Sequence, residues 1–112
     1  MVVVWTDYAR ESAAHILEFV CKCWGDPMAM TVWESVQNDA SLLGYYPQLG
    51  SVYSVFKYKS QDINIRELVV NKKNKLFYLV YGESVYILLL WDTRANPQKL
   101  KRLLTSLSKK IL

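Results

Sequence analysis

Two lysines alternate with two aromatic residues near the middle of the chain, in the stretch Phe56-Lys57-Tyr58-Lys59. In an extended strand, residues two positions apart share a face, so Lys57 and Lys59 would lie together beside the rings. Cations attract phosphates and aromatic rings stack on bases, a combination typical of nucleic-acid binding. An exposed edge strand protected by lysines would show the same alternation.

Basic residues are concentrated in the second half of the sequence. Residues 1–55 carry two Lys or Arg against six Asp or Glu, and residues 56–112 carry twelve against four, which gives net charges of −4 and +8. Such an asymmetry indicates an anionic partner, although a solvated basic surface would give the same numbers. With Lys57 and Lys59 we therefore group Lys72 and Lys73 as predicted nucleic-acid contacts.

The sequence offers little for metal or cofactor chemistry. Cys21 and Cys23 lie two apart in an expected helix, where they point about 200° apart and cannot pair with each other. With His15 as the single histidine they make no zinc site, and we expect no metal and no cofactor. The four tryptophans are expected in the core or at an interface.

Length and composition predict one domain over residues 1–112. Its 52% hydrophobic content is enough to bury a core. The longest apolar run, 85–91, is far shorter than the ~20 residues of a membrane span, so no membrane partner is expected. The first residues have no basic leader or cleavage site, and we expect a cytoplasmic protein.

The first half of the chain predicts a strand and two helices. The apolar run 2–5 is typical of a strand, and Thr6 caps a helix that Gly25 ends. Asp26 is the expected N-cap of the next helix, with the following proline as its first residue. Residues 6–44 are therefore expected to form a helical hairpin with a very short connection.

The second half predicts a sheet and a last helix. Strands are expected over 63–70, 75–81 and 84–91, joined by links short enough for an antiparallel arrangement, whereas 52–62 is a strand or an ordered loop. A helix capped by Asn96 has one apolar face that docks on the free side of the sheet, on a partner, or on both. The fold class is α+β: an N-terminal strand and helical hairpin packed on a small antiparallel sheet, with a C-terminal helix.

Several segments carry a more specific pattern than this order of elements. They are Ala9…Ala13…Ile16-Leu17 followed by Gly25-x₃-Ala29, Leu43-x₃-Pro47-x₂-Gly50, Ile65-Arg66-Glu67-Leu68, Lys75-Leu76-Phe77-Tyr78-x₂-Tyr81, and the run from Ile87 to Arg94. Together, over roughly residues 5–100, they resemble the RelE/ParE superfamily, the toxins of bacterial type II toxin–antitoxin pairs. The resemblance implies a single RelE/ParE-like toxin domain that a cognate antitoxin wraps and neutralises.

The superfamily has two functional branches, and the sequence leaves both open. RelE-like toxins enter the ribosomal A site and cut mRNA with basic side chains and no metal. ParE-like toxins block DNA gyrase and are not nucleases. The long helical hairpin favours the ParE-like branch, and a set of basic residues favours the RelE-like branch. A non-toxic member that only binds a partner is a third possibility.

The nuclease branch implies catalytic roles for three cations. Carried over by position, Arg66 lies on one central strand, Lys75 begins the next, and Arg94 follows the last strand. They would hold a phosphate and help a 2′-hydroxyl attack it, because positioned cations stabilise the charge that builds on the equatorial oxygens. Each could instead make an ordinary ion pair. This chain also lacks the late Tyr or His frequent in that branch, since no Tyr follows Tyr86.

Overall fold

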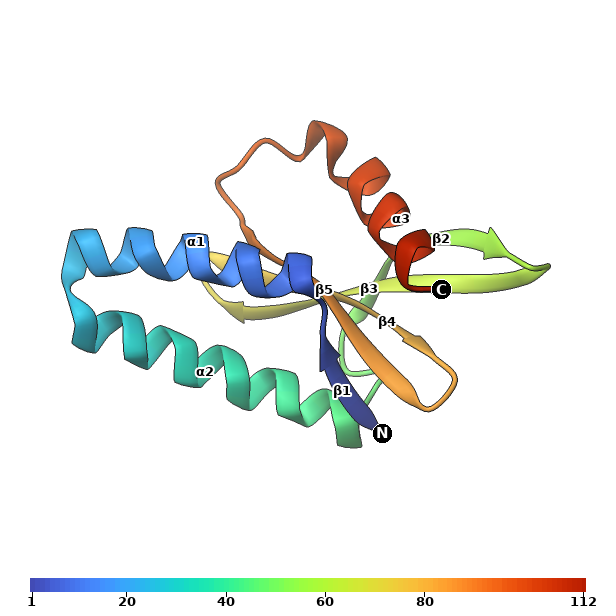
Figure 1. The fold of residues 1–112 in the computed structure, drawn as a ribbon, viewed down its shortest axis with the longest axis horizontal. Helices are drawn as coiled ribbons and strands as arrows, with labels where there is room; N and C mark the ends of the chain where they lie inside the picture. The colour runs from blue at the N-terminus through green and yellow to red at the C-terminus, as the bar shows by residue number, and fades with distance from the viewer.

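The N-terminal strand leads directly into two long helices that lie side by side. In the computed structural model, which describes residues 1–112, β1 spans Val2–Trp5, α1 spans Asp7–Trp24 and α2 spans Asp26–Tyr45. The Thr6 hydroxyl accepts a hydrogen bond from the Ala9 amide at 3.2 Å, so Thr6 is the predicted N-cap of α1. The two helices run beyond the sheet and end in a protruding tip (Figure 1).

A single residue, Gly25, connects the two helices. Its φ of +89° lies in the region that favours glycine, which confirms that it ends α1. The prediction that Asp26 caps α2 was wrong by one residue, because Gly25 is at once the C-cap of α1 and the N-cap of α2. The Asp26 carboxylate instead accepts a hydrogen bond from the Cys21 thiol at 2.7 Å, and this bond raises the pKa of Cys21.

The rest of the chain forms a sheet followed by a short helix. Its strands are β2 (Ser51–Tyr58), β3 (Gln61–Asn71), β4 (Asn74–Tyr81) and β5 (Ser84–Asp92), in the order β1-β5-β4-β3-β2. The four strands β2 to β5 form the predicted antiparallel meander, and residues 52–62 turn out to be β2 and the start of β3. β1 adds to β5 in parallel, with Val3 opposite Val85.

Each face of the sheet has its own apolar core. Under α1 and α2, the core gathers around Ala13, Leu43 and Tyr78, and all three side chains are at most 2% exposed. On the other face, α3 (Leu100–Ile111) follows a short 3₁₀ turn (Pro97–Lys99) and buries Leu104 against the sheet. The leucine face of the last helix therefore docks on the free side of the sheet, one of the arrangements the sequence left open.

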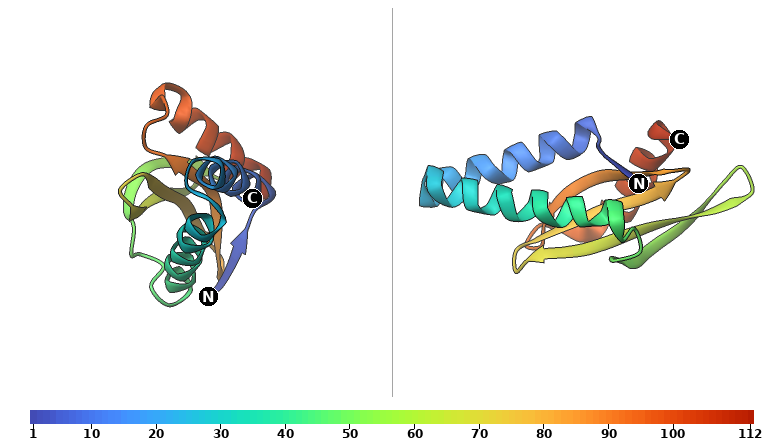
Figure 2. Two further views of the ribbon diagram at one scale, coloured as in Figure 1. Left: turned by 90° about the vertical axis from the view of Figure 1, so that its left-hand side faces the viewer. Right: turned by 90° about the horizontal axis from the view of Figure 1, so that it is seen from below.

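The molecule is elongated because its two ends extend in opposite directions. The helical hairpin projects at one end, and the long arm of β2 and β3 projects at the other (Figure 2, right). The overall extents are 47 × 31 × 22 Å. None of the three helices combines the length and apolar character that crossing a lipid bilayer requires.

Candidate functional site

Arg66 points to the sheet face that α1 and α2 cover. It lies on β3 opposite Tyr78, a member of the core beneath these helices. One guanidinium nitrogen, Nη1, donates to the Gly50 carbonyl at 2.7 Å. The Tyr78 hydroxyl accepts from the Gly50 amide at 2.8 Å and donates to the Pro47 carbonyl at 2.9 Å. Arg66 therefore helps to hold the loop between α2 and β2 against the sheet.

Lys75 lies on the opposite face of the same sheet. Its strand neighbour on that face, Phe77, belongs to the core under α3. The Lys75 ammonium lies 3.5 Å from the Glu67 carboxylate, and both side chains are about a third exposed or less. The sheet thus separates Lys75 from Arg66, and each has its own partner.

Arg94 lies beyond β5 in a fork with Asp92. Its Nε and Nη2 donate to the two carboxylate oxygens of Asp92 at 3.1 and 3.0 Å, and its amide donates to the same carboxylate at 2.9 Å. The Arg94 side-chain hydrogen bonds lower the pKa of Asp92, and Asp92 in turn raises the pKa of Arg94. The guanidinium carbon lies 5.7 Å from the centre of the Phe19 ring on α1. Arg94 is therefore next to the helical hairpin.

This ion pair predicts a pH-dependent contribution to stability. Because the folded-state pKa of Asp92 is lowered, its stabilisation is complete above the ordinary carboxyl pKa and is lost as pH falls through the lowered value. We expect Asp92→Asn to lower the free energy of unfolding most near neutral pH and progressively less in acid. Urea unfolding across this pH range measures the difference, and a constant difference would contradict the assignment.

Asp39 provides a control of opposite sign. Burial raises the pKa of this carboxyl, so its ionisation on raising the pH costs stability in the folded state. Asp39→Asn is therefore expected to gain stability relative to the natural protein as the pH rises. The two variants should diverge in opposite directions in the same urea series.

Lys72 and Lys73 form the turn between β3 and β4, which lies against the hairpin. The Lys73 ammonium is 4.9 Å from the centre of the Trp24 ring, an attractive cation–π arrangement. The Lys73 carbonyl accepts from the amide and the hydroxyl of Thr93 at 2.9 and 3.2 Å. The turns that carry Lys73 and Arg94 are thereby tied together, and both cations approach aromatic rings of α1.

An apolar surface is exposed where these turns meet the hairpin. The Phe19 and Trp24 rings pack edge to face at 6.3 Å, yet 47% and 53% of these residues remain exposed, as does 46% of Met28. An open hollow of about 450 Å³ lies between Trp24, Met28 and Lys73. We call Phe19, Trp24, Met28, Lys73 and Arg94 the hairpin surface. Exposed apolar side chains rimmed by charge are typical of a protein-binding site.

The predicted pairing of Lys57 and Lys59 on one strand face was wrong. β2 ends at Tyr58, and Lys59 and Ser60 form a two-residue turn with φ values of +49° and +64°. Lys57 makes an ion pair with Asp62 at 2.9 Å, and the Lys59 ammonium lies 5.3 Å from the centre of the Tyr58 ring. The two lysines therefore do not share one surface. A nucleic-acid contact at either of them stays a prediction.

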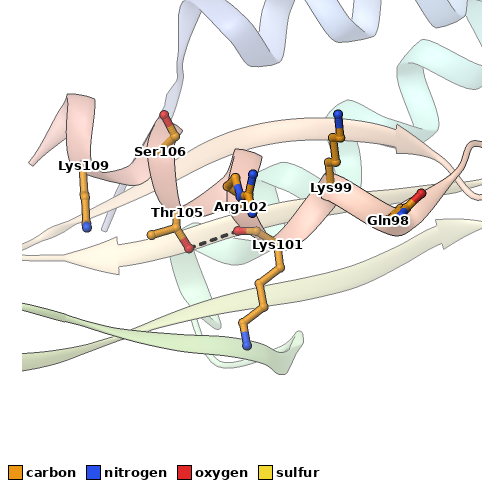
Figure 3. A pocket seen from close by; sticks show the side chains of 7 residues that line it. All are labelled: Gln98, Lys99, Lys101, Arg102, Thr105, Ser106 and Lys109. Atoms are coloured by element: carbon orange, nitrogen blue, oxygen red, sulfur yellow. Dashed lines mark hydrogen bonds between the residues drawn. The ribbon is translucent and has the colours of Figure 1, made fainter.

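Sequence reasoning missed the cations on the outer side of α3. Lys99, Lys101, Arg102 and Lys109 surround an open hollow of about 730 Å³ that contains no hydrophobic side chain (Figure 3). A signal was present in the sequence, because no acidic residue follows Asp92.

Neither the known protein families nor the curated proteins provide a relative of this chain. No protein-family model matches the sequence, and no curated protein matches it either. No group of three or more His, Cys, Asp or Glu side chains is close enough to hold a metal ion.

Proposed function

We propose that this chain is the toxin of a type II toxin–antitoxin pair and acts in the cytoplasm by binding DNA gyrase, as ParE-like toxins do. The observation that carries the choice of branch is the separation of the three predicted catalytic cations. Arg66 and Lys75 lie on opposite faces of the sheet, and Arg94 is held by Asp92. Stabilising one phosphate requires cations that converge on it, so this arrangement favours a toxin that binds over one that cuts.

The hairpin surface supplies what a protein target needs. Apolar and aromatic side chains at the centre of an interface contribute most of its binding energy, and Trp24 is of the residue type most enriched there. The Lys73 ammonium lies over the Trp24 ring and makes no ion pair, so an acidic residue of the target would meet a cation beside an apolar anchor. The hairpin tip also projects beyond the sheet, where a large partner can reach it (Figure 1).

Two assays separate the branches. Expression is expected to arrest growth, with relief by a co-expressed cognate antitoxin. The purified protein is expected to inhibit supercoiling by gyrase and to leave mRNA intact in a translating extract. Lys75→Gln should inhibit gyrase as strongly as the natural protein, because its contact with Glu67 lies on the sheet face under α3.

Other outcomes would overturn the proposal in distinct ways. Cleavage of mRNA that is lost in Arg66→Ala and Arg94→Ala would identify a RelE-like endonuclease. Normal growth, active gyrase and intact mRNA together would identify a non-toxic member of the superfamily. Circular dichroism of each variant establishes that it is folded, so that a loss of activity is not caused by unfolding.

A further inference from the structure

The outer side of α3 is a cationic surface of regular geometry. Gln98, Arg102, Thr105 and Lys109 recur at helical spacing, flanked by Lys99 and Lys101. The side chains of Lys99 and Lys101 extend to opposite sides of the helix, and Lys109 lies at its far end (Figure 3). We call Lys99, Lys101, Arg102 and Lys109 the α3 surface.

These four cations have no acidic partner within the protein. The five ion pairs of the structure occupy Arg10, Lys22, Lys57, Lys75 and Arg94, and none involves the α3 surface. The hollow between the four side chains also contains no acidic residue. Four cations over three turns therefore repel one another and create a local positive potential that an anion would relieve.

The character of the hollow selects among anionic ligands. Single strands are held by stacking their bases on aromatic rings, and acidic peptides are anchored by apolar side chains. The hollow offers neither aromatic rings for stacking nor apolar side chains for anchoring, because all seven lining residues are polar or charged. A phosphate backbone needs only cations and hydrogen-bond donors. Ser106 adds a hydroxyl between the charges, whereas the Thr105 hydroxyl donates to the Lys101 carbonyl at 3.0 Å.

The length of the α3 surface suits a duplex. The ten residue-to-residue steps from Lys99, the last residue of the 3₁₀ turn, to Lys109 span about 15 Å, a length of double-stranded DNA that carries about nine phosphates. Four long, exposed cations on such a span can reach several of them at once. The open shape of the hollow also leaves room for a rod-like ligand to lie along the helix.

We propose that the α3 surface binds the phosphate backbone of duplex DNA without sequence preference. The proposal adds to the proposed function, since gyrase works on DNA and a toxin docked on it by the hairpin surface would have α3 free for the bound duplex. The hairpin tip and α3 occupy different regions of the molecule, so both contacts can form together (Figure 1). DNA binding itself can be measured without gyrase.

Salt dependence of binding to a labelled duplex tests the proposal. Four phosphate contacts predict that affinity falls about 150-fold between about 50 and 200 mM salt, because each contact contributes about −0.9 to the logarithmic slope. Removing two charges with Lys101→Gln and Arg102→Gln should reduce that fall to about 12-fold. Both side chains are exposed, so the double variant should fold normally.

A charge-matched double variant serves as the control. Arg10→Gln and Lys22→Gln also remove two exposed cations, but these are paired with Asp7 and Glu18 on α1. This control should keep the slope of the natural protein. Equal slopes in the two double variants would overturn the proposal, as would tighter binding to a single strand of the same length or equal competition by polyglutamate.

The gyrase assay distinguishes failure of this inference from failure of the proposed function. Inhibition of gyrase with no binding to free duplex would overturn the α3 proposal alone. Binding to duplex that depends on the α3 surface, without effect on gyrase, would uphold it and overturn the proposed target.

Discussion

Replacing Trp24 by alanine is expected to abolish growth arrest while the protein stays folded. Truncating an aromatic anchor at an interface costs about 2–4 kcal/mol, which weakens binding about 30- to 700-fold. The side chain is 53% exposed, so its loss removes little of the core and should cost about 1 kcal/mol of stability or less. Growth on induction and inhibition of gyrase by the purified variant measure the effect, with a thermal melt to establish folding.

Tyr45→Ala is the matched control for this variant. Tyr45 is also an exposed aromatic residue of the helical hairpin, at 81%, but it ends α2 at the far end from the tip. Under the proposed function it should arrest growth as strongly as the natural sequence. Growth arrest that persists in Trp24→Ala would show that the hairpin surface does not engage the target.

The largest effect on stability is expected for Tyr78→Phe. The Tyr78 hydroxyl joins the Gly50 amide and the Pro47 carbonyl at a residue that is fully buried. Removing it leaves two backbone groups without partners, and we expect a loss of about 2–4 kcal/mol in the free energy of unfolding. The loop backbone lies close to β3 here, since a Cβ built at Gly50 would lie 2.5 Å from the Glu67 carbonyl oxygen.

Tyr86→Phe removes the same hydroxyl from a site without this network. Tyr86 is partly buried against the core under α3, and its hydroxyl makes no hydrogen bond in the structure. The free energy of unfolding of Tyr86→Phe should stay within about 0.5 kcal/mol of that of the natural protein. Chemical denaturation of both variants compares them directly, and equal losses would contradict the role given to Tyr78.

Local chemistry in the sequence predicted most of the elements. Thr6 caps α1 as expected, and the Asn96 side-chain oxygen Oδ1 accepts from the Gln98 amide at 3.0 Å at the start of the last helical segment. The leucines of α3 repeat at helical spacing, and so its buried side could be predicted. Each of these signals acts within one or two turns of the chain.

Two features of the sheet had no such local signal. Lys59 and Ser60 both adopt positive φ in the turn between β2 and β3, a conformation usually provided by Asn-Gly, so the turn could not be predicted. β1 pairs in parallel with β5, with Val2 opposite Ser84, so most of the chain lies between the two strands. Pairing at that distance depends on how the helical hairpin and the meander pack together, which the residues of β1 do not encode.

The candidate site depended on strand register, which the sequence did not determine. Arg66 lies opposite Tyr78, and Lys75 comes three residues before Tyr78 on the same strand. An odd separation along a strand places two side chains on opposite faces, so this register alone separates Arg66 from Lys75. A shift by one residue would have brought them to one face and favoured the nuclease branch.

Because α3 has a polar outer side and an apolar inner side, binding of a ligand to the outer side affects the stability of the core beneath the helix. The helix carries its cations on one side and Leu104 on the other, and Leu104 is part of the cover over one face of the sheet. A ligand that binds α3 only while the helix is docked raises the free energy of undocking. The increase is about 2.7 kcal/mol when the ligand concentration is a hundred times its Kd. Occupancy of an exposed, polar surface would then decide how often the apolar interior on that side opens to water.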